Sequence, residues 1–175
     1  KLTTPVYTGK IKKESYNVKK YFLENDKKDF ALPVYVMQQP EAKTENVVVW
    51  LHPEGKAALW EEELLPELMK QNYAVIAADL PGIGELEDPD FRGDGFVRSV
   101  PFNYMFGANL AGKSVPGIQA EALDVVIQFI QRDFASKEVA AITDGPLNQV
   151  LLHYAALKNP FAKILLRHPL ESNRS

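Results

Sequence analysis

The sequence predicts an α/β domain built as a three-layer sandwich, with a mostly parallel sheet between two layers of helices. Short, continuous apolar runs alternate along the chain with segments of helical spacing, which is typical of a parallel sheet covered on both faces. Hydrophobic residues make up 46% of the 175 residues, enough for one substantial core. We therefore expect a single domain over residues 1–175, with a β-hairpin in residues 1–40 and an α/β core in residues 45–170.

The N-terminal region predicts two antiparallel strands. Residues 11–24 alternate loosely between apolar and polar, residues 26–29 supply a polar turn, and residues 30–38 return as a β-branched apolar run. The continuous apolar run at 47–51 then indicates a strand buried on both faces.

The middle of the chain predicts one helix, one strand and a long irregular segment. Apolar residues recur at helical spacing from Leu59 to Met69, and Pro66 within this pattern predicts a kink or a late start of the helix. Residues 73–78 form a second buried strand. Residues 85–114 show no clear period and are rich in Gly, Pro, Asp and Asn, which predicts a functional or packed surface excursion.

The last third of the chain alternates regularly between helix and strand. Helical spacing over residues 118–130, with Pro116 placed for the first turn, predicts a helix. A strand at 139–143, a helix at 147–157 and a strand at 163–166 follow. These elements complete the predicted sandwich.

Composition and charge argue against several functional classes. The 20 basic and 23 acidic residues give a net charge of −3 without a basic stripe, so we expect no nucleic-acid partner. No apolar run approaches the roughly 20 residues that span a bilayer, so we expect no membrane partner. The absence of cysteine excludes disulfides, thiolate zinc sites and a cysteine nucleophile. We expect neither a metal nor a cofactor.

The segment from residue 139 to residue 157 contains the most informative motif. A buried strand, a small-residue turn and a helix form the elbow on which a hydrolase exposes its nucleophile. Counting back from the helix places Gly145 at the apex, where a side chain is required for attack. The neighbouring Asp144 is the nearest candidate nucleophile, but we expect it to cap the helix together with Thr143.

Three motifs follow the predicted strands in a characteristic order: His52-Pro53-Glu54-Gly55-Lys56, Asp79-Leu80-Pro81-Gly82-Ile83-Gly84-Glu85, and the turn at Gly145. Together they resemble the α/β-hydrolase superfamily and, within it, the acetylxylan-esterase-like proteins. The similarity is greatest to the second, degenerate hydrolase-like domain of tandem-domain members. It extends to residues 106–121, 152–157 and 169–172, and so covers most of the chain after residue 45.

The resemblance implies an α/β-hydrolase sheet that lacks its last strands, because the sequence ends soon after the strand at 163–166. It also implies a protein of carbohydrate-ester metabolism with a periplasmic or secreted location. The partner would be an upstream catalytic domain of the same polypeptide, and the ligand a carbohydrate ester.

The loop after residue 51 would supply the oxyanion hole of such a fold. This loop contains His52, Glu54 and Gly55, separated by Pro53, which has no N–H to donate. The N–H groups of Glu54 and Gly55 remain as donors, but the Glu54 carboxylate disfavours a developing oxyanion. We expect a degenerate loop.

A catalytic base must come from one of three histidines, His52, His153 or His168. We expect His153 to lie in the core, and His168 either to approach the carboxyl edge of the sheet or to lie in a loop. Ser172 is a second candidate nucleophile. Because the candidates Asp144, His168 and Ser172 do not form a recognisable triad, we expect a non-catalytic module, with an active ester hydrolase that uses Asp144 or Ser172 as the alternative.

A further motif points to a different chemistry. Residues 107–114 satisfy a phosphate-binding pattern in which backbone N–H groups and a lysine hold phosphates. The pattern depends on four residues: Gly107, Gly112, Lys113 and Ser114. No clear strand precedes it and Pro116 interrupts the helix that should begin at the lysine. Phosphate or nucleotide binding is therefore a second alternative.

The acidic residues after the strand at 73–78 are a weaker candidate for a cation site: Asp79, Glu85, Glu87 and Asp88. Their spacing fits no ion-binding loop. We expect a solvated loop.

Overall fold

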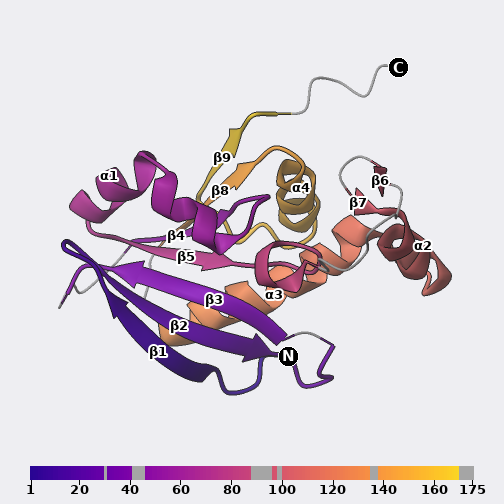
Figure 1. Cartoon of the computed structure of the whole chain (residues 1–175), viewed down its shortest axis with the longest axis horizontal. Coiled ribbons are helices and arrows are strands. Elements are labelled where there is room, and N and C mark those ends of the chain that lie inside the picture. Colours follow the sequence, from indigo (N-terminus) through magenta and orange to yellow (C-terminus); the bar gives the residue numbers. More distant parts are fainter. Residues whose placement is uncertain (30, 41–45, 88–95, 98–99, 135–137, 170–175) are drawn as a thin grey trace.

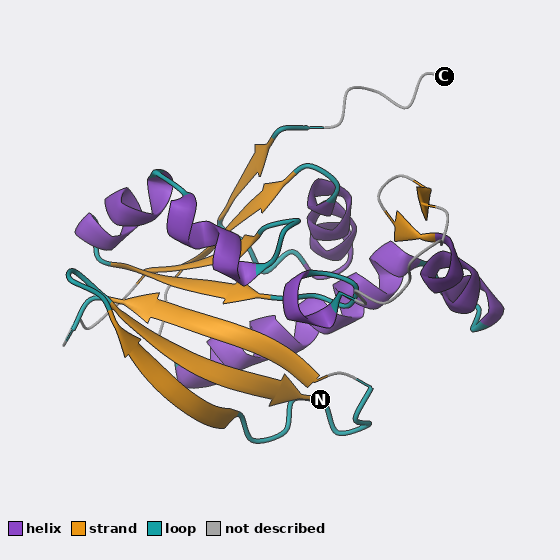
Figure 2. Ribbon diagram, viewed as in Figure 1, coloured by secondary structure: helices purple, strands orange, loops and turns teal. Residues whose placement is uncertain are grey.

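The protein folds around a seven-stranded mixed sheet with helices on both faces (Figures 1 and 2). The computed structural model describes residues 1–29, 31–40, 46–87, 96–97, 100–134 and 138–169. Strand order in the sheet is β1-β2-β3-β5-β4-β8-β9. This arrangement is the three-layer α/β sandwich that the sequence predicts.

The strands of the large sheet are β1 (Val6–Lys12), β2 (Asn17–Glu24), β3 (Ala31–Gln38), β4 (Asn46–Leu51), β5 (Tyr73–Ala78), β8 (Glu138–Asp144) and β9 (Lys163–Arg167). The helices are η1 (Lys56–Glu61), α1 (Leu64–Lys70), η2 (Gly84–Leu86), α2 (Phe102–Leu110), α3 (Val115–Asp133) and α4 (Leu147–Lys158). Two short strands, β6 (Phe96–Val97) and β7 (Val100–Pro101), pair with each other.

The sheet has a parallel part and an antiparallel part. β5, β4, β8 and β9 are parallel to one another, as predicted. β1, β2 and β3 form an antiparallel meander joined to β5. The predicted hairpin corresponds to β2 and β3, and β1 is an additional strand. The loosely alternating segment 11–24 conceals a turn, in which the Lys13 N–H donates to the Tyr16 carbonyl oxygen over 2.9 Å.

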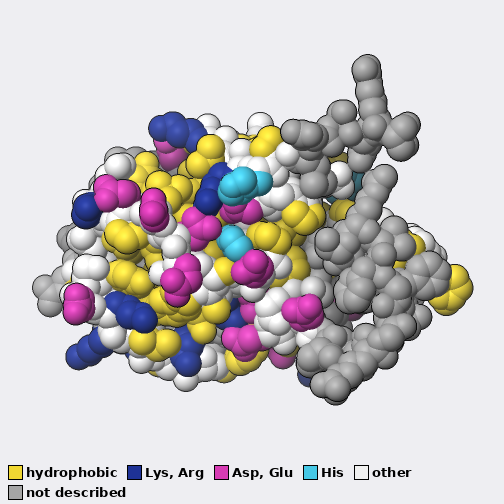
Figure 3. All heavy atoms as spheres, turned by 45° about the horizontal axis from the view of Figure 1, so that its top comes forward, with side chains coloured by type: hydrophobic (Ala, Val, Ile, Leu, Met, Phe, Trp, Pro, Cys, Tyr) yellow, Lys and Arg dark blue, Asp and Glu magenta, His cyan; other side chains and the backbone are white. Residues whose placement is uncertain are grey.

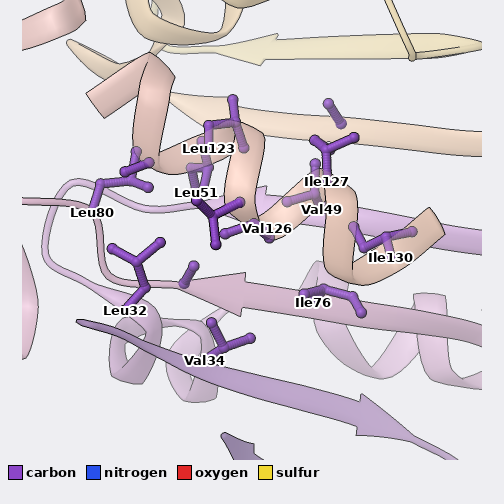
Figure 4. Packing of buried hydrophobic residues seen from close by; sticks show 14 of the residues in the cluster. Leu32, Val34, Val49, Leu51, Ile76, Leu80, Leu123, Val126, Ile127 and Ile130 are labelled. Atoms are coloured by element: carbon purple, nitrogen blue, oxygen red, sulfur yellow. The ribbon is translucent and has the colours of Figure 1, made fainter. Parts of the chain in front are cut away.

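Helices α3 and α4 cover one face of the sheet. In Figure 4, apolar side chains of α3 such as Leu123 and Ile127 point toward Val49 and Leu51 of β4. The apolar positions of α3 recur at helical spacing, and ten of its residues are buried. Burial of this stripe fixes α3 on the sheet.

Helices η1 and α1 cover the other face. Their Leu59, Leu65 and Met69 pack against Trp50 of β4, which is fully buried. The predicted helix 59–69 is divided into these two elements, and Pro66 lies in the first turn of α1. This is the late start that the proline predicts, because the first turn needs no N–H at that position.

The irregular segment 85–114 contains one helix that its pattern does not indicate. Among the described residues, α2 occupies residues 102–110, where Gly107 weakens both the apolar period and the helix propensity. Of the helices that the structure describes, none combines the length and the apolar character that crossing a membrane requires.

Asp124 links α3 to α4 and supports a first prediction. Its carboxylate accepts from the Tyr154 hydroxyl and the Lys158 ammonium, each over 2.8 Å, and from Gln128 over 2.9 Å. Burial works to raise the pKa of Asp124, but these donors outweigh it and the net pKa is lowered.

We expect Asp124→Asn to lower the free energy of unfolding by about 1–2 kcal/mol at pH 7. Because the pKa of Asp124 is lower in the folded state, its contribution is present above the unfolded value of about 3.9 and is lost as the pH falls through the folded value. Urea unfolding from pH 7 to pH 3 should show the two proteins converging at low pH. The exposed pair of Lys70 and Glu67 provides the control, since Glu67→Gln should change stability by less than about 0.5 kcal/mol.

Candidate functional site

Polar side chains gather at the carboxyl ends of the four parallel strands. His52 follows β4 and Asp79 follows β5. Asp144 ends β8, Arg167 ends β9, and His168 follows β9. Figure 3 shows histidine, acidic and basic side chains close together near the centre of one face. Ligand sites of parallel α/β sheets lie at this edge, so it is the candidate site.

Gly145 lies at the turn between β8 and α4, at the position expected for a nucleophile. Its φ of +53° is in the left-handed region, and its N–H donates to the Arg167 carbonyl oxygen over 3.1 Å. A Cβ atom placed on Gly145 would meet nothing within 4 Å. The turn therefore has space for a nucleophilic side chain, and the residue present does not provide one.

The neighbouring Asp144 is a buried carboxylate with three partners. One oxygen accepts from Trp50 Nε1 over 3.2 Å. The other faces Arg167 Nε at 3.3 Å and His168 Nδ1 at 3.1 Å. Because both oxygens are occupied by donors from within the chain, Asp144 is poorly placed to attack a substrate.

The prediction that Asp144 and Thr143 cap α4 is wrong. The residue at the N-cap of α4 is Pro146, and no side chain caps this helix end. The Thr143 hydroxyl instead donates to Asn148 Oδ1 over 2.7 Å. Asp144 instead contacts Trp50 of β4 and Arg167 and His168 at the end of β9. These residues are far from Asp144 in the sequence, so its local pattern does not reveal them.

The structure brings together two of the three candidate catalytic residues. A carboxylate can only accept, so Nδ1 of His168 carries the proton in its contact with Asp144. The His168 side chain is 76% exposed. Ser172 lies outside the described residues. His153, expected in the core, is exposed on α4, because the apolar face that packs on the sheet is formed by its neighbours.

The two oxyanion donors expected in the loop after β4 are already bonded within that loop. The N–H of Glu54 donates to His52 Nδ1 over 3.2 Å, and the N–H of Gly55 donates to the His52 carbonyl oxygen over 3.0 Å. His52 Nε2 lies 3.5 Å from Glu62 Oε1, so both ring nitrogens of His52 are engaged. Pro53 has no N–H, so neither Glu54 nor Gly55 compensates for it with an unbonded donor.

Lys56 and Asp79 form a buried ion pair that the sequence analysis missed. The Lys56 ammonium lies 2.6 Å from Asp79 Oδ2 and also contacts Glu85, and the Lys56 N–H donates to Asp79 Oδ1 over 2.6 Å. Burial works to lower the pKa of Lys56, but the hydrogen bonds and charges of the two carboxylates raise it overall. The predicted solvated loop is thus wrong for Asp79, and Asp88 lies outside the described residues.

Arg167 connects the end of β9 to two other elements. Its guanidinium donates to Glu62 Oε2 over 2.8 Å and lies 5.4 Å from the Trp50 ring centroid. No local pattern around Arg167 or Glu62 reveals this contact, because the two residues are 105 positions apart. Across the described part of the chain, no three histidine, cysteine or acidic side chains group closely enough to hold a metal ion.

The residues of the phosphate-binding pattern have other roles. Gly107 lies within α2, and Gly112 lies in the turn that follows, where the Lys113 N–H donates to the Ala108 carbonyl oxygen over 2.9 Å. The Lys113 ammonium pairs with Glu121 over 2.7 Å, and Ser114 caps α3. The N–H groups that would hold a phosphate are therefore used to end one helix and begin another.

Sequence comparison with family models and with curated proteins finds no match. Solved structures nevertheless share the fold. A Bacteroides fragilis protein assigned as an acetyl xylan esterase superposes with a TM-score of 0.76 at 12% identity, over 93% of this chain and 47% of that protein. Acetyl xylan esterase 1 of Thermoanaerobacterium gives 0.66 at 11% identity, over 91% and 50%.

A cold-adapted esterase from an Arctic intertidal metagenomic library gives a TM-score of 0.65 at 20% identity, over 92% of this chain and 64% of that esterase. The chain thus spans about half to two thirds of the length of these proteins. The comparisons establish an esterase-like fold of the α/β-hydrolase type, as the resemblance implies.

Proposed function

We propose that this chain is a non-catalytic hydrolase-like module of a carbohydrate esterase, acting as a scaffold or binding domain. The proteins of similar fold include two assigned as acetyl xylan esterases, which supports the substrate class. The chain corresponds to only part of each of them, which supports a module within a larger assembly.

The proposal rests on the turn at Gly145, where no nucleophilic side chain is present. Acyl transfer on an elbow needs a nucleophile at the apex and N–H donors that stabilise the oxyanion. The apex has no side chain, and the Asp144 carboxylate beside it is occupied by Trp50, Arg167 and His168. The N–H groups of Glu54 and Gly55 are bonded to His52. Both requirements are therefore unmet by these residues.

The proposed partner is a catalytic hydrolase domain of the same polypeptide, upstream of this chain, and the proposed ligand is a carbohydrate ester. Such a partner would supply the nucleophile that this elbow lacks. The module would then contribute surface and stability, and the chemistry would take place elsewhere.

Hydrolysis of p-nitrophenyl acetate tests the proposal. We expect the purified chain to show no turnover above the buffer rate. We expect the same of Gly145→Ser, because the added hydroxyl fits the open space but gains no free oxyanion donor from the loop after β4. Circular dichroism should confirm that both proteins are folded. Turnover by the unaltered chain that disappears in Asp144→Asn would contradict the proposal.

A second candidate is ester hydrolysis with a displaced nucleophile, such as Ser172. The contact between His168 and Asp144 favours it, because a carboxylate on Nδ1 orients an imidazole to act as a base through Nε2. Activity that is lost in both His168→Ala and Ser172→Ala would select this candidate over the scaffold.

A further inference from the structure

The turn that follows β4 is closed by two hydrogen bonds to His52. The N–H of Gly55 donates to the His52 carbonyl oxygen over 3.0 Å, and the N–H of Glu54 donates to His52 Nδ1 over 3.2 Å. The first bond joins two backbone groups, neither of which titrates. The second bond ends on an imidazole nitrogen, which can gain a proton. One of the two bonds is therefore sensitive to protonation.

The contacts of His52 determine its neutral tautomer. Nδ1 accepts a hydrogen bond and so carries no proton, which leaves the proton on Nε2. Nε2 lies 3.5 Å from Glu62 Oε1, a carboxylate oxygen that can only accept. The side chains of His52 and Glu62 are only 14% and 18% exposed. The ring is thus held between a donor on one side and an acceptor on the other.

Protonation of His52 adds a hydrogen to Nδ1, because Nε2 already carries one. An imidazolium ring has two donors and no acceptor, so the Nδ1–H and the Glu54 N–H would face each other over 3.2 Å. Two donors in this position repel each other. The contact between Nε2 and Glu62 becomes charge-assisted at the same time and holds the ring. The bond to Glu54 is therefore the one that breaks.

Gly55 keeps the turn in place when this bond is lost. It is buried at a φ of +90°, and a Cβ atom added there would lie 2.7 Å from Cα of Gly84. The next N–H, that of Lys56, donates to Asp79 Oδ1 over 2.6 Å. Because the residues after Glu54 are anchored in this way, protonation releases the Glu54 N–H without unfolding the loop.

The charged groups beside His52 form a network whose net charge depends on its protonation. Glu62 Oε2 accepts from Arg167 over 2.8 Å, and Arg167 Nε lies 3.3 Å from Asp144, which also contacts His168. Two carboxylates and one guanidinium give a net charge of −1 when both histidines are neutral. A proton on His52 brings this charge to zero. The other ionisable side chains on the adjoining elements are exposed or pair with one another: Glu54, Lys56, Glu61, Glu63, Asp79 and Glu85.

We propose that His52 is a pH-dependent switch, whose protonation releases the Glu54 N–H and creates a binding site for a small carboxylate anion. The Nδ1–H of His52 and the Glu54 N–H are then two adjacent donors that one carboxylate can accept. The neutral network no longer repels an anion. While His52 is neutral, the ring itself occupies the Glu54 N–H and the site is closed. This site goes beyond the proposed function, because it needs neither a nucleophile nor a partner domain.

An NMR titration from about pH 8 to about pH 5 tests the release, because imidazoles change charge in this range. We expect the amide chemical shifts of Glu54 to follow the titration of the His52 ring with the same midpoint, and those of Gly55 to stay nearly constant. In His52→Asn, the side-chain oxygen can replace Nδ1 as the acceptor but cannot gain a proton. The Glu54 amide of this variant should not titrate. His168→Asn is the matched control: it removes the other imidazole of the network and should leave the titration of Glu54 unchanged.

Acetate binding, followed through the same amide shifts at constant ionic strength, tests the anion site. We expect acetate to bind the unaltered chain at least about tenfold more tightly at about pH 5.5 than at about pH 8. In His52→Asn, the two affinities should differ by less than about twofold. Acetamide has a similar shape but no charge, and it should not bind at either pH.

Three results would overturn the proposal. One is a Glu54 amide whose shifts do not follow the titration of His52. Another is acetate binding that keeps its pH dependence in His52→Asn, since the net charge of the chain would then explain it. The third is the absence of acetate binding at the lower pH. None of these outcomes depends on whether the chain hydrolyses p-nitrophenyl acetate, so the switch and the proposed function are tested separately.

Discussion

Replacing Lys56 with methionine is expected to lower the free energy of unfolding by about 3–5 kcal/mol, the usual cost of removing one member of a buried ion pair. Lys56 and Asp79 are only 2% and 1% exposed. Without the ammonium, the Asp79 carboxylate keeps its backbone donors from Lys56 and Glu85 but loses its cation. The carboxylate then stays buried without a counter-ion, which is costly.

Urea unfolding at pH 7 measures this effect, and Lys70→Met is the matched control. Lys70 pairs with Glu67 on the surface of α1, so its loss should change stability by less than about 1 kcal/mol. Equal stability losses in the two variants would show that the buried pair contributes no more than a surface one.

The sequence predicts those parts of the fold whose burial leaves a regular apolar pattern along the chain. β5 begins and ends at the predicted residues 73 and 78, because a strand buried on both faces is a continuous apolar run. Helix α3 was equally visible, since its buried stripe recurs at helical spacing. Strand β1 was missed because it is an edge strand, largely exposed, and carries little apolar pattern.

The candidate site likewise has one part that the sequence predicts and another that it does not. The turn at Gly145 is recognisable because a strand, a small-residue turn and a helix follow one another directly. The partners of Asp144 are not recognisable from the sequence. Trp50, whose indole N–H donates to Asp144, is 94 positions away and lies in a strand that the sequence predicts only as part of the core. Likewise Lys56 and Asp79, 23 positions apart, meet only because β4 and β5 are adjacent and parallel. Ion pairs between loops depend on strand order, which pattern alone does not determine.

The close packing of the loops after β4 and β5 gives a second prediction of large effect, for the substitution Gly84→Ala. Gly84 has a φ of +57°, and a Cβ atom added there would lie 2.5 Å from Cγ of Asp79. Asp79 cannot retreat without breaking its contact with Lys56. We therefore expect the variant to lower the free energy of unfolding by about 3–4 kcal/mol, the sum of a left-handed backbone penalty and overpacking.

Gly145→Ala separates these two contributions, because it shares the left-handed backbone but not the crowding. Its φ is +53° and its added Cβ meets nothing within 4 Å, so it should cost only about 1 kcal/mol. Thermal or urea unfolding of the two variants, side by side, measures the difference. If they lose the same stability, the carboxylate of Asp79 is free to move and the buried pair does not hold the two loops rigidly. If Gly84→Ala loses more stability, the difference is due to crowding against Asp79, which the ion pair with Lys56 holds in place. The open space at Gly145 then belongs only to the turn between β8 and α4.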